Sequence, residues 1–216
     1  MLVRDRMTAN PVIVHPDVSV PDALALMRER GIRRLPVVDA KGKLVGIVSE
    51  KDLLYASPSP STSLSVWEIH TLLGKLKVER VMSKSVVSVA EDTPIEDAAR
   101  IMAERKIGGL PVMRGDALVG IVTETDLFRV FVDLLGGYRS GVRLTARIGG
   151  AKGTMARITQ AILDVGGDIV GLGVGDATDA PGQTFKVAVK VQGVDKQKLA
   201  EAIKPVVMEI IDVRGE

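Results

Sequence analysis

Two short motifs place a hydroxyl three residues before a carboxylate: Ser49-x-x-Asp52 and Thr123-x-x-Asp126. A carboxylate can accept hydrogen bonds from both hydroxyls of a ribose. A hydroxyl beside the free backbone N–H groups of a helix start can meet a phosphate. The same spacing also matches a capping box, in which both side chains only satisfy backbone N–H groups. The motifs alone leave both interpretations open.

A pair of arginines, Arg33-Arg34, precedes a Leu-Pro step, and the corresponding residues later in the chain are Gly108-Gly109. Because a guanidinium is planar and carries a fixed fork of N–H donors, it can bind one phosphate through two hydrogen bonds. The alternative is a solvated rim, in which both arginines only face water. The two segments therefore differ in charge at a place where a phosphate could be bound.

These motifs belong to an internal repeat, in which residues 3–54 recur at 78–128. The match is visible by eye where residues 44–53 reappear as 118–127, and one residue is lost in the turn before them. A copy of roughly fifty residues is marginally stable alone, because it covers only one face of a sheet. We therefore expect the two copies to pack against each other as a pseudo-twofold pair.

Each copy is predicted to have the order β-α-β-β-α. In the first copy, residues 12–14 favour a short strand, and Ser19 can cap the helix that follows. Two apolar, β-branched runs at 35–38 and 44–48 favour a hairpin, and Ser49 then opens a second helix. This order places each hydroxyl–carboxylate motif at the point where a hairpin strand becomes a helix.

The hairpin entry at residues 34–39 and the closing segment at 46–52, both repeated, resemble a CBS domain. The two copies resemble a CBS pair, or Bateman module, over residues 1 to about 135. In this family the pair encloses two clefts that often bind adenine nucleotides or related adenosyl compounds, and it regulates partners. The resemblance therefore implies a ligand such as AMP, ADP, ATP or S-adenosylmethionine.

The family's ribose-binding Asp occupies the position that Asp52 and Asp126 match. In CBS pairs this Asp commonly shares its cleft with the basic residue before Leu-Pro in the other repeat. The resemblance thus implies that Asp126 works with Arg34, whereas Asp52 faces Gly109, and that the Asp126 cleft prefers a phosphorylated ligand. The candidate binding residues are the two motifs, the arginines and the glycine opposite them: Ser49, Asp52, Thr123, Asp126, Arg33, Arg34 and Gly109.

After Gly136-Gly137 the pattern changes to a predicted β-α-β-β-α-β order, which is ferredoxin-like. The succession of strand, Gly153, helix and Gly166-Gly167 resembles an ACT domain, a fold that commonly binds amino acids at subunit interfaces. We expect the glycines to permit a tight turn and the domain to dimerise or dock.

Composition excludes several classes of protein. The 216 residues include no cysteine and two histidines, so we predict no disulfide, thiolate nucleophile or metal site. The 29 basic and 27 acidic residues give a net charge of +2 without a block of like charge, which argues against nucleic-acid binding. Because the chain has neither an apolar leader nor a long apolar run, we expect a cytoplasmic protein without membrane association.

We therefore expect an α+β protein with repeats at 1–56 and 78–135, a loop and linker helix at 57–77, and an ACT-like domain at 141–216. The order of these domains resembles the AcuB-type acetoin-utilisation proteins along the whole chain. That resemblance implies a regulatory rather than catalytic role and leaves the target open. We also expect a homodimer, and no set of residues in the sequence indicates an enzyme. Two alternatives stay open: an amino-acid-responsive regulator with empty nucleotide clefts, and a nucleic-acid-binding protein.

Overall fold

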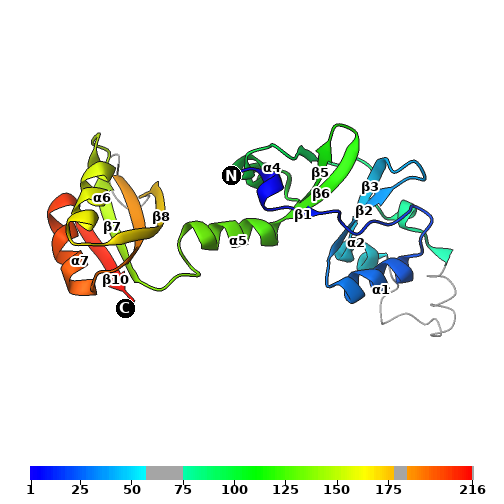
Figure 1. The fold of residues 1–216 in the computed structure, drawn as a ribbon. Helices are drawn as coiled ribbons and strands as arrows, with labels where there is room; N and C mark the ends of the chain where they lie inside the picture. Colours follow the sequence, from blue (N-terminus) through cyan, green and yellow to red (C-terminus); the bar gives the residue numbers. More distant parts are fainter. Residues whose placement is uncertain (57–74, 178–183, 216) are drawn as a thin grey trace. The chain divides into compact units, whose positions relative to one another are not determined.

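The computed structural model describes residues 1–56, 75–177 and 184–215. The chain forms two compact units, Met1–Leu127 and Phe128–Glu216, and each is described by itself (Figure 1). The loop and linker helix predicted at 57–77 fall outside the described residues, except for residues 75–77.

The first unit contains the repeat as two successions of helix, hairpin and helix. Short pieces precede each succession: the 3-10 turn η1 (Val3–Asp5) and β1 (Thr8–Ala9) in the first copy, and η2 (Val78–Arg80) and β4 (Val89–Ala90) in the second. The first copy continues with α1 (Val20–Arg30), β2 (Arg34–Val38), β3 (Leu44–Ser49) and α2 (Glu50–Tyr55). The second continues with α4 (Ile95–Arg105), β5 (Gly109–Arg114), β6 (Ala117–Thr123) and α5 (Glu124–Leu134).

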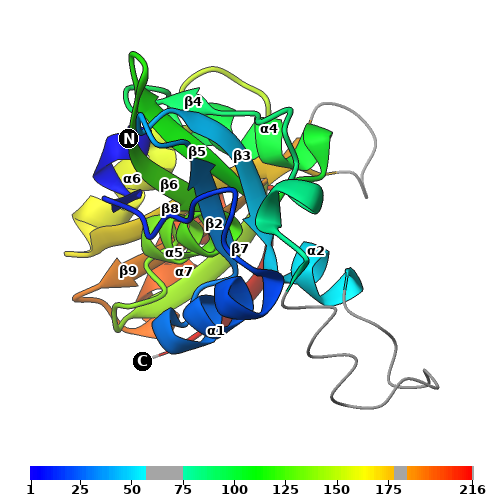
Figure 2. The same ribbon diagram turned by 90° about the vertical axis from the view of Figure 1, so that its right-hand side faces the viewer.

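The first helix forms where the sequence predicts it. Ser19 is the N-cap of α1, and its side chain accepts a hydrogen bond from Asp22 N at 3.3 Å. Figure 2 shows the ribbons of α1, α2 and hairpin β2–β3. The buried side chains of these elements form one apolar core. Val48 of β3 and Leu53 of α2 are fully buried in this core, so the strand before Ser49 and the helix after it are held in place.

The short strand predicted at residues 12–14 is wrong in length. Only Val14 pairs, in a parallel bridge with Val37, through hydrogen bonds with Pro36 O at 3.1 Å and Val38 N at 3.0 Å. The next bonds of this parallel ladder would need an N–H from Pro36, toward Val12, and from Pro16, toward Val38. Proline lacks a backbone N–H, so the ladder does not extend in either direction.

The opening segment of each repeat pairs with a strand of the other repeat. β1 lies antiparallel to β6, with Thr8 opposite Ile121. In the reciprocal place, Ser83 bridges Ile47 of β3 through two backbone hydrogen bonds of 2.9 and 3.0 Å. The two repeats are thus joined by a mutual exchange, which is the arrangement expected of a pseudo-twofold pair.

The second unit has the predicted β-α-β-β-α-β order. Its antiparallel sheet has the strand order β10-β7-β9-β8, with the helices packed against one face. The elements are β7 (Val142–Gly149), α6 (Thr154–Asp164), β8 (Asp168–Asp176), β9 (Thr184–Gln192), α7 (Lys196–Ile203) and β10 (Glu209–Arg214). Gly153, at the N-cap of α6, has a φ of 81°, which a side chain would strain.

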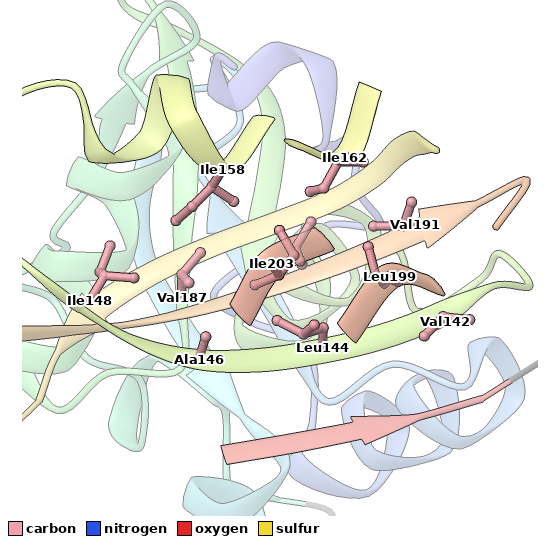
Figure 3. Close-up of a cluster of buried hydrophobic side chains, with 11 residues drawn as sticks. Val142, Leu144, Ala146, Ile148, Ile158, Ile162, Val187, Val191, Leu199 and Ile203 are labelled. Carbon is pink, nitrogen blue, oxygen red and sulfur yellow. The ribbon is translucent and has the colours of Figure 1, made fainter. Parts of the chain in front are cut away.

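The core of this unit follows from the alternation of β7 and β9. Every second residue from 142 to 148 and from 187 to 191 is buried in one core with side chains of α6 and α7 (Figure 3). The helices contribute Ile158, Ile162, Leu199 and Ile203, all at most 1% exposed. The strands contribute Val142, Leu144, Ala146, Ile148, Val187, Val189 and Val191.

The segment after α5 lies against the glycine-rich strand β8. A Cβ added at Gly171 would overlap the backbone of Leu135 and Gly136, and one added at Gly173 would lie 2.7 Å from Leu135 Cδ2. In contrast, none of the residues that the structure describes has an atom within 4 Å of a Cβ added at Gly175 of the same strand. Gly171 is therefore needed for close approach of the two backbones.

We expect Gly171→Ala to lower the free energy of unfolding by about 1–3 kcal/mol, because neither backbone can give way without moving its element. Gly175→Ala is the matched control, and its effect is expected to stay within about 0.5 kcal/mol. Urea unfolding of the full chain, followed by circular dichroism, measures both. Equal stabilities of the two variants would contradict this packing.

Candidate functional site

A pocket of about 480 Å³ in the first unit is lined by both repeats. The first repeat contributes the arginine pair and the first hydroxyl–carboxylate motif, and the second contributes its glycine pair and the first residue of α5. The polar, charged and glycine residues that line it are Arg33, Arg34, Ser49, Glu50, Lys51, Asp52, Ser83, Ser85, Lys106, Gly108, Gly109 and Glu124.

The Ser49–Asp52 motif forms a capping box at the start of α2. Asp52 Oδ2 accepts hydrogen bonds from Ser49 N at 2.8 Å and Ser49 Oγ at 2.7 Å, and Ser49 Oγ accepts one from Asp52 N at 3.3 Å. Both hydrogen bonds to the carboxylate use Oδ2, and among the described residues no hydrogen bond reaches Oδ1. The Arg34 guanidinium interacts with this carboxylate electrostatically. The cap thus fixes the carboxylate while one oxygen stays available in the pocket.

The Thr123–Asp126 motif repeats this geometry at the start of α5. Asp126 Oδ2 accepts hydrogen bonds from Thr123 N at 2.9 Å and Thr123 Oγ1 at 2.7 Å. The Asp126 residue is only 8% exposed, and neither it nor Thr123 lines the pocket just described. The two motifs are therefore alike in hydrogen bonding but not in their access to this pocket.

Arg34 crosses from the first repeat into the space over the glycine pair of the second. A Cβ added at Gly108 would overlap Arg34 Nη2, and one added at Gly109 would lie 2.9 Å from Arg34 Cδ. The guanidinium ends beside the Glu124 carboxylate, with Nη2 3.7 Å from Oε2. The two copies therefore differ in a complementary way. The Arg34 side chain of the first copy occupies space that side chains at Gly108 and Gly109 of the second copy would fill.

Arg34, Asp52 and Gly109 all line this one pocket. The family resemblance places Gly109, but not Arg34, opposite Asp52. The expected partner of Arg34 was Asp126, whereas its guanidinium contacts Glu124, two residues earlier in the chain. Sequence reasoning did not single out Glu124. An acid directly after the hydroxyl in both motifs, Glu50 and Glu124, is the sequence feature that could have indicated it.

The charges of the pocket suit a ligand that combines hydroxyls with an anionic group. Burial lowers the pKa of the Arg34 guanidinium from its ordinary value, and the Glu124 carboxylate acts in the opposite direction. An arginine stays charged even so, because its ordinary pKa is far above neutral pH. Besides the two arginines, Lys51 and Lys106 supply positive charge.

One wall of the pocket is the segment 83–88, whose residues alternate between two cavities. Ser83, Ser85 and Val87 line the pocket with Asp52. The residues between them line a second pocket of about 680 Å³, together with Lys41 and Lys43 of the β2–β3 turn. The six residues therefore separate two pockets, and a shift of this segment would change both.

Among residues 1–56, 75–177 and 184–215, no cluster of three or more histidine, aspartate or glutamate side chains could hold a metal ion. The same described ranges contain no helix with the length and apolar character needed to cross a membrane.

The model of the CBS domain family matches residues 3–59 and 78–133, which together make up just over half of the chain. The chain belongs to the CBS domain family. Each matched segment covers one repeat, so the two repeats form a CBS pair, and the resemblance predicted from the sequence is confirmed for this part of the chain. The ACT resemblance of residues 141–216 stays a prediction.

Solved structures similar to the chain include the AcuB protein of Vibrio cholerae, named for acetoin utilization. It is 37% identical, with a TM-score of 0.52, over 62% of this chain and 93% of that protein. The CBS pair of protein MJ0100, solved with 5′-methylthioadenosine and S-adenosyl-L-methionine, is 30% identical, with a TM-score of 0.51, over 64% and 98%. CBSX2, solved with AMP, is 34% identical, with a TM-score of 0.50, over 61% and 96%.

Curated relatives differ widely in length. The chain spans only 32% of the uncharacterized protein MJ1404 of Methanocaldococcus jannaschii, to which it is 36% identical over 61% of its own length. Some relatives are enzymes, such as an inosine-5′-monophosphate dehydrogenase of Korarchaeum cryptofilum, of which 22% is matched. The region that matches this chain therefore makes up less than a third of each of these two proteins.

Proposed function

We propose that the chain is a regulatory sensor whose CBS pair binds an adenosyl ligand, such as AMP, ADP, ATP or S-adenosylmethionine. The observation that carries the proposal is that one pocket joins an oriented carboxylate, Asp52, with two guanidinium groups, Arg33 and Arg34. The ligands named for the solved MJ0100 and CBSX2 structures support the same chemical class.

In this proposal, Asp52 Oδ1 accepts hydrogen bonds from the ribose hydroxyls, and Ser49 holds the carboxylate in position. Arg34, with Arg33 beside it, binds the phosphate of a nucleotide. The pocket volume of about 480 Å³ falls within the range of roughly 300–1,000 Å³ that is usual for small-molecule sites.

The proposal ranks the Asp52 pocket above the Asp126 cleft, which is the reverse of the order expected from the sequence. The reason is access, because Asp52 lines a pocket with both arginines and Asp126 is 8% exposed. Thr123 and Asp126 are proposed as a second, weaker binding cleft of the pair.

We also propose that residues 141–216 form an ACT-like domain through which the protein forms homodimers or docks on a target enzyme. Their β-α-β-β-α-β order supports this assignment. The similarity to AcuB of Vibrio cholerae supports a link to acetoin utilisation. The proposed role is regulatory rather than catalytic, and the proposed location is the cytoplasm.

A thermal-shift assay on the full chain tests the ligand class. AMP, ADP, ATP and S-adenosylmethionine are compared with a panel of amino acids. A ligand at about a hundred times its Kd stabilises the folded chain by about 2.7 kcal/mol, which raises Tm by several degrees.

A shift with at least one adenosyl compound is expected. A shift with amino acids only would favour the alternative sensor in residues 141–216, and no shift with any adenosyl compound would contradict the proposal. Binding to nucleic acid would instead show a steep dependence on salt concentration.

A further inference from the structure

Two arginines of the first repeat hold the first turn of a helix in the second repeat. Arg34 Nη2 lies 3.7 Å from Glu124 Oε2, and Arg33 Nη2 donates a hydrogen bond to Thr125 Oγ1 at 3.5 Å. Glu124 and Thr125 are the first two residues of α5. The contacts therefore tie the pocket directly to the start of this helix.

The contact between Arg34 and Glu124 is weak enough for an anionic ligand to replace Glu124 as the partner of Arg34. The Glu124 side chain is 59% exposed and the Arg34 side chain 22%, so water competes for the glutamate end of the pair. At 3.7 Å the two atoms are also farther apart than the 2.7–2.9 Å typical of strong charge-assisted hydrogen bonds. A phosphate that made two such bonds to the guanidinium would bind it more strongly than Glu124 does.

We propose that the Glu124 carboxylate is an internal competitor for the anionic group of the ligand, so that an anionic ligand releases the start of α5 and a neutral ligand leaves it in place. This inference rests on the proposed function, because it assigns an adenosyl ligand to the same pocket. It adds that the response of the protein depends on the charge of that ligand. A nucleotide and a neutral adenosyl compound would both bind, with different effects on α5.

Helix α5 connects the pocket with the second unit along the chain. α5 continues from Glu124 to Leu134, whereas the boundary between the two compact units lies between Leu127 and Phe128. The helix whose first turn faces the ligand is thus also the covalent connection to the second unit. In this proposal, ligand binding affects α5 by releasing Glu124 from Arg34.

Calorimetry on the full chain with AMP and with 5′-methylthioadenosine tests the competition, because the second compound lacks the phosphate. In Glu124→Gln, which removes the competing charge, we expect the affinity for AMP relative to 5′-methylthioadenosine to rise about two- to fivefold. In Arg34→Gln we expect the same ratio to fall about tenfold or more.

Glu104→Gln is the matched control for Glu124→Gln. Glu104 is also a glutamate in an ion pair with an arginine, Arg100, and its side chain is also 59% exposed. It lies on α4 and does not line the pocket. We expect its ratio of affinities to equal that of the wild type.

Hydrogen exchange supplies a readout that does not depend on affinity. We expect AMP to accelerate amide exchange at residues 124–128 of the wild type, and 5′-methylthioadenosine not to do so. In Glu124→Gln these amides are expected to exchange faster already without ligand.

The outcomes separate the two proposals. If the wild type binds only one of the two compounds or neither, this inference fails, and the thermal-shift panel with ADP, ATP and S-adenosylmethionine decides separately whether the proposed function stands. If the wild type binds both, but Glu124→Gln and Glu104→Gln give the same ratio of affinities, the proposed function stands and the competition is refuted.

Discussion

Asp52→Asn is expected to bind AMP about 10- to 100-fold more weakly than the wild type. Hydrogen bonds to a charged group are worth about 1.5–3 kcal/mol, and the substitution removes the charge of the proposed ribose acceptor. Asparagine keeps an acceptor oxygen for the Ser49 N–H, so the cap of α2 and the fold are retained. Calorimetry on the full chain measures the change in Kd.

Asp126→Asn is the matched control, because Asp126 caps α5 through the same pair of hydrogen bonds. Its effect on AMP binding is expected to be smaller than that of Asp52→Asn. If Asp126→Asn abolished binding and Asp52→Asn did not, the order of the two clefts expected from the sequence would be right and the order proposed from the structure would be wrong.

Leu199→Ala is expected to lower the free energy of unfolding by about 2–5 kcal/mol. Leu199 is fully buried between α7 and the sheet of the second unit, and truncating it removes apolar burial and leaves a cavity (Figure 3). Small domains are stable by only about 5–15 kcal/mol, so this loss is a large fraction of the total. Chemical denaturation followed by circular dichroism measures it.

Leu163→Ala is the matched control for Leu199→Ala. It shows whether the loss of stability comes from lost burial or from the change in helix propensity. It is the same substitution in the other helix of the unit, but Leu163 is 64% exposed. Its effect is expected to stay within about 0.5 kcal/mol. Comparable losses in both variants would mean that Leu199 is not the core residue that its burial indicates.

Most of the fold could be predicted from the sequence because its patterns are local. Ser19 and Ser49 cap helices where the sequence places them, and alternation in residues 142–148 identifies the buried face of β7. The strand at residues 12–14 was predicted too long. Its apolar side chains favour a strand, but neighbouring prolines lack the N–H groups that further hydrogen bonds of the ladder would need.

The site could be predicted only in part, because its residues come together across the repeats. Ser49, Asp52 and their capping geometry follow from spacing alone. The path of Arg34 does not, since it depends on how closely Gly108 lets the other repeat approach. Glu124 was missed for the same reason, as its role appears only once Arg34 has been placed.

The mutual exchange of opening segments has a consequence for how such a protein can arise. A chain carrying one repeat alone would lack the partner for its own opening segment, and a second molecule of the same chain would supply it by domain swapping. Two separate molecules would thereby form the contacts that β1 makes with β6 and Ser83 with Ile47. Fusion of duplicated genes would then turn an intermolecular assembly into a single polypeptide, free to let one half acquire arginines and the other glycines.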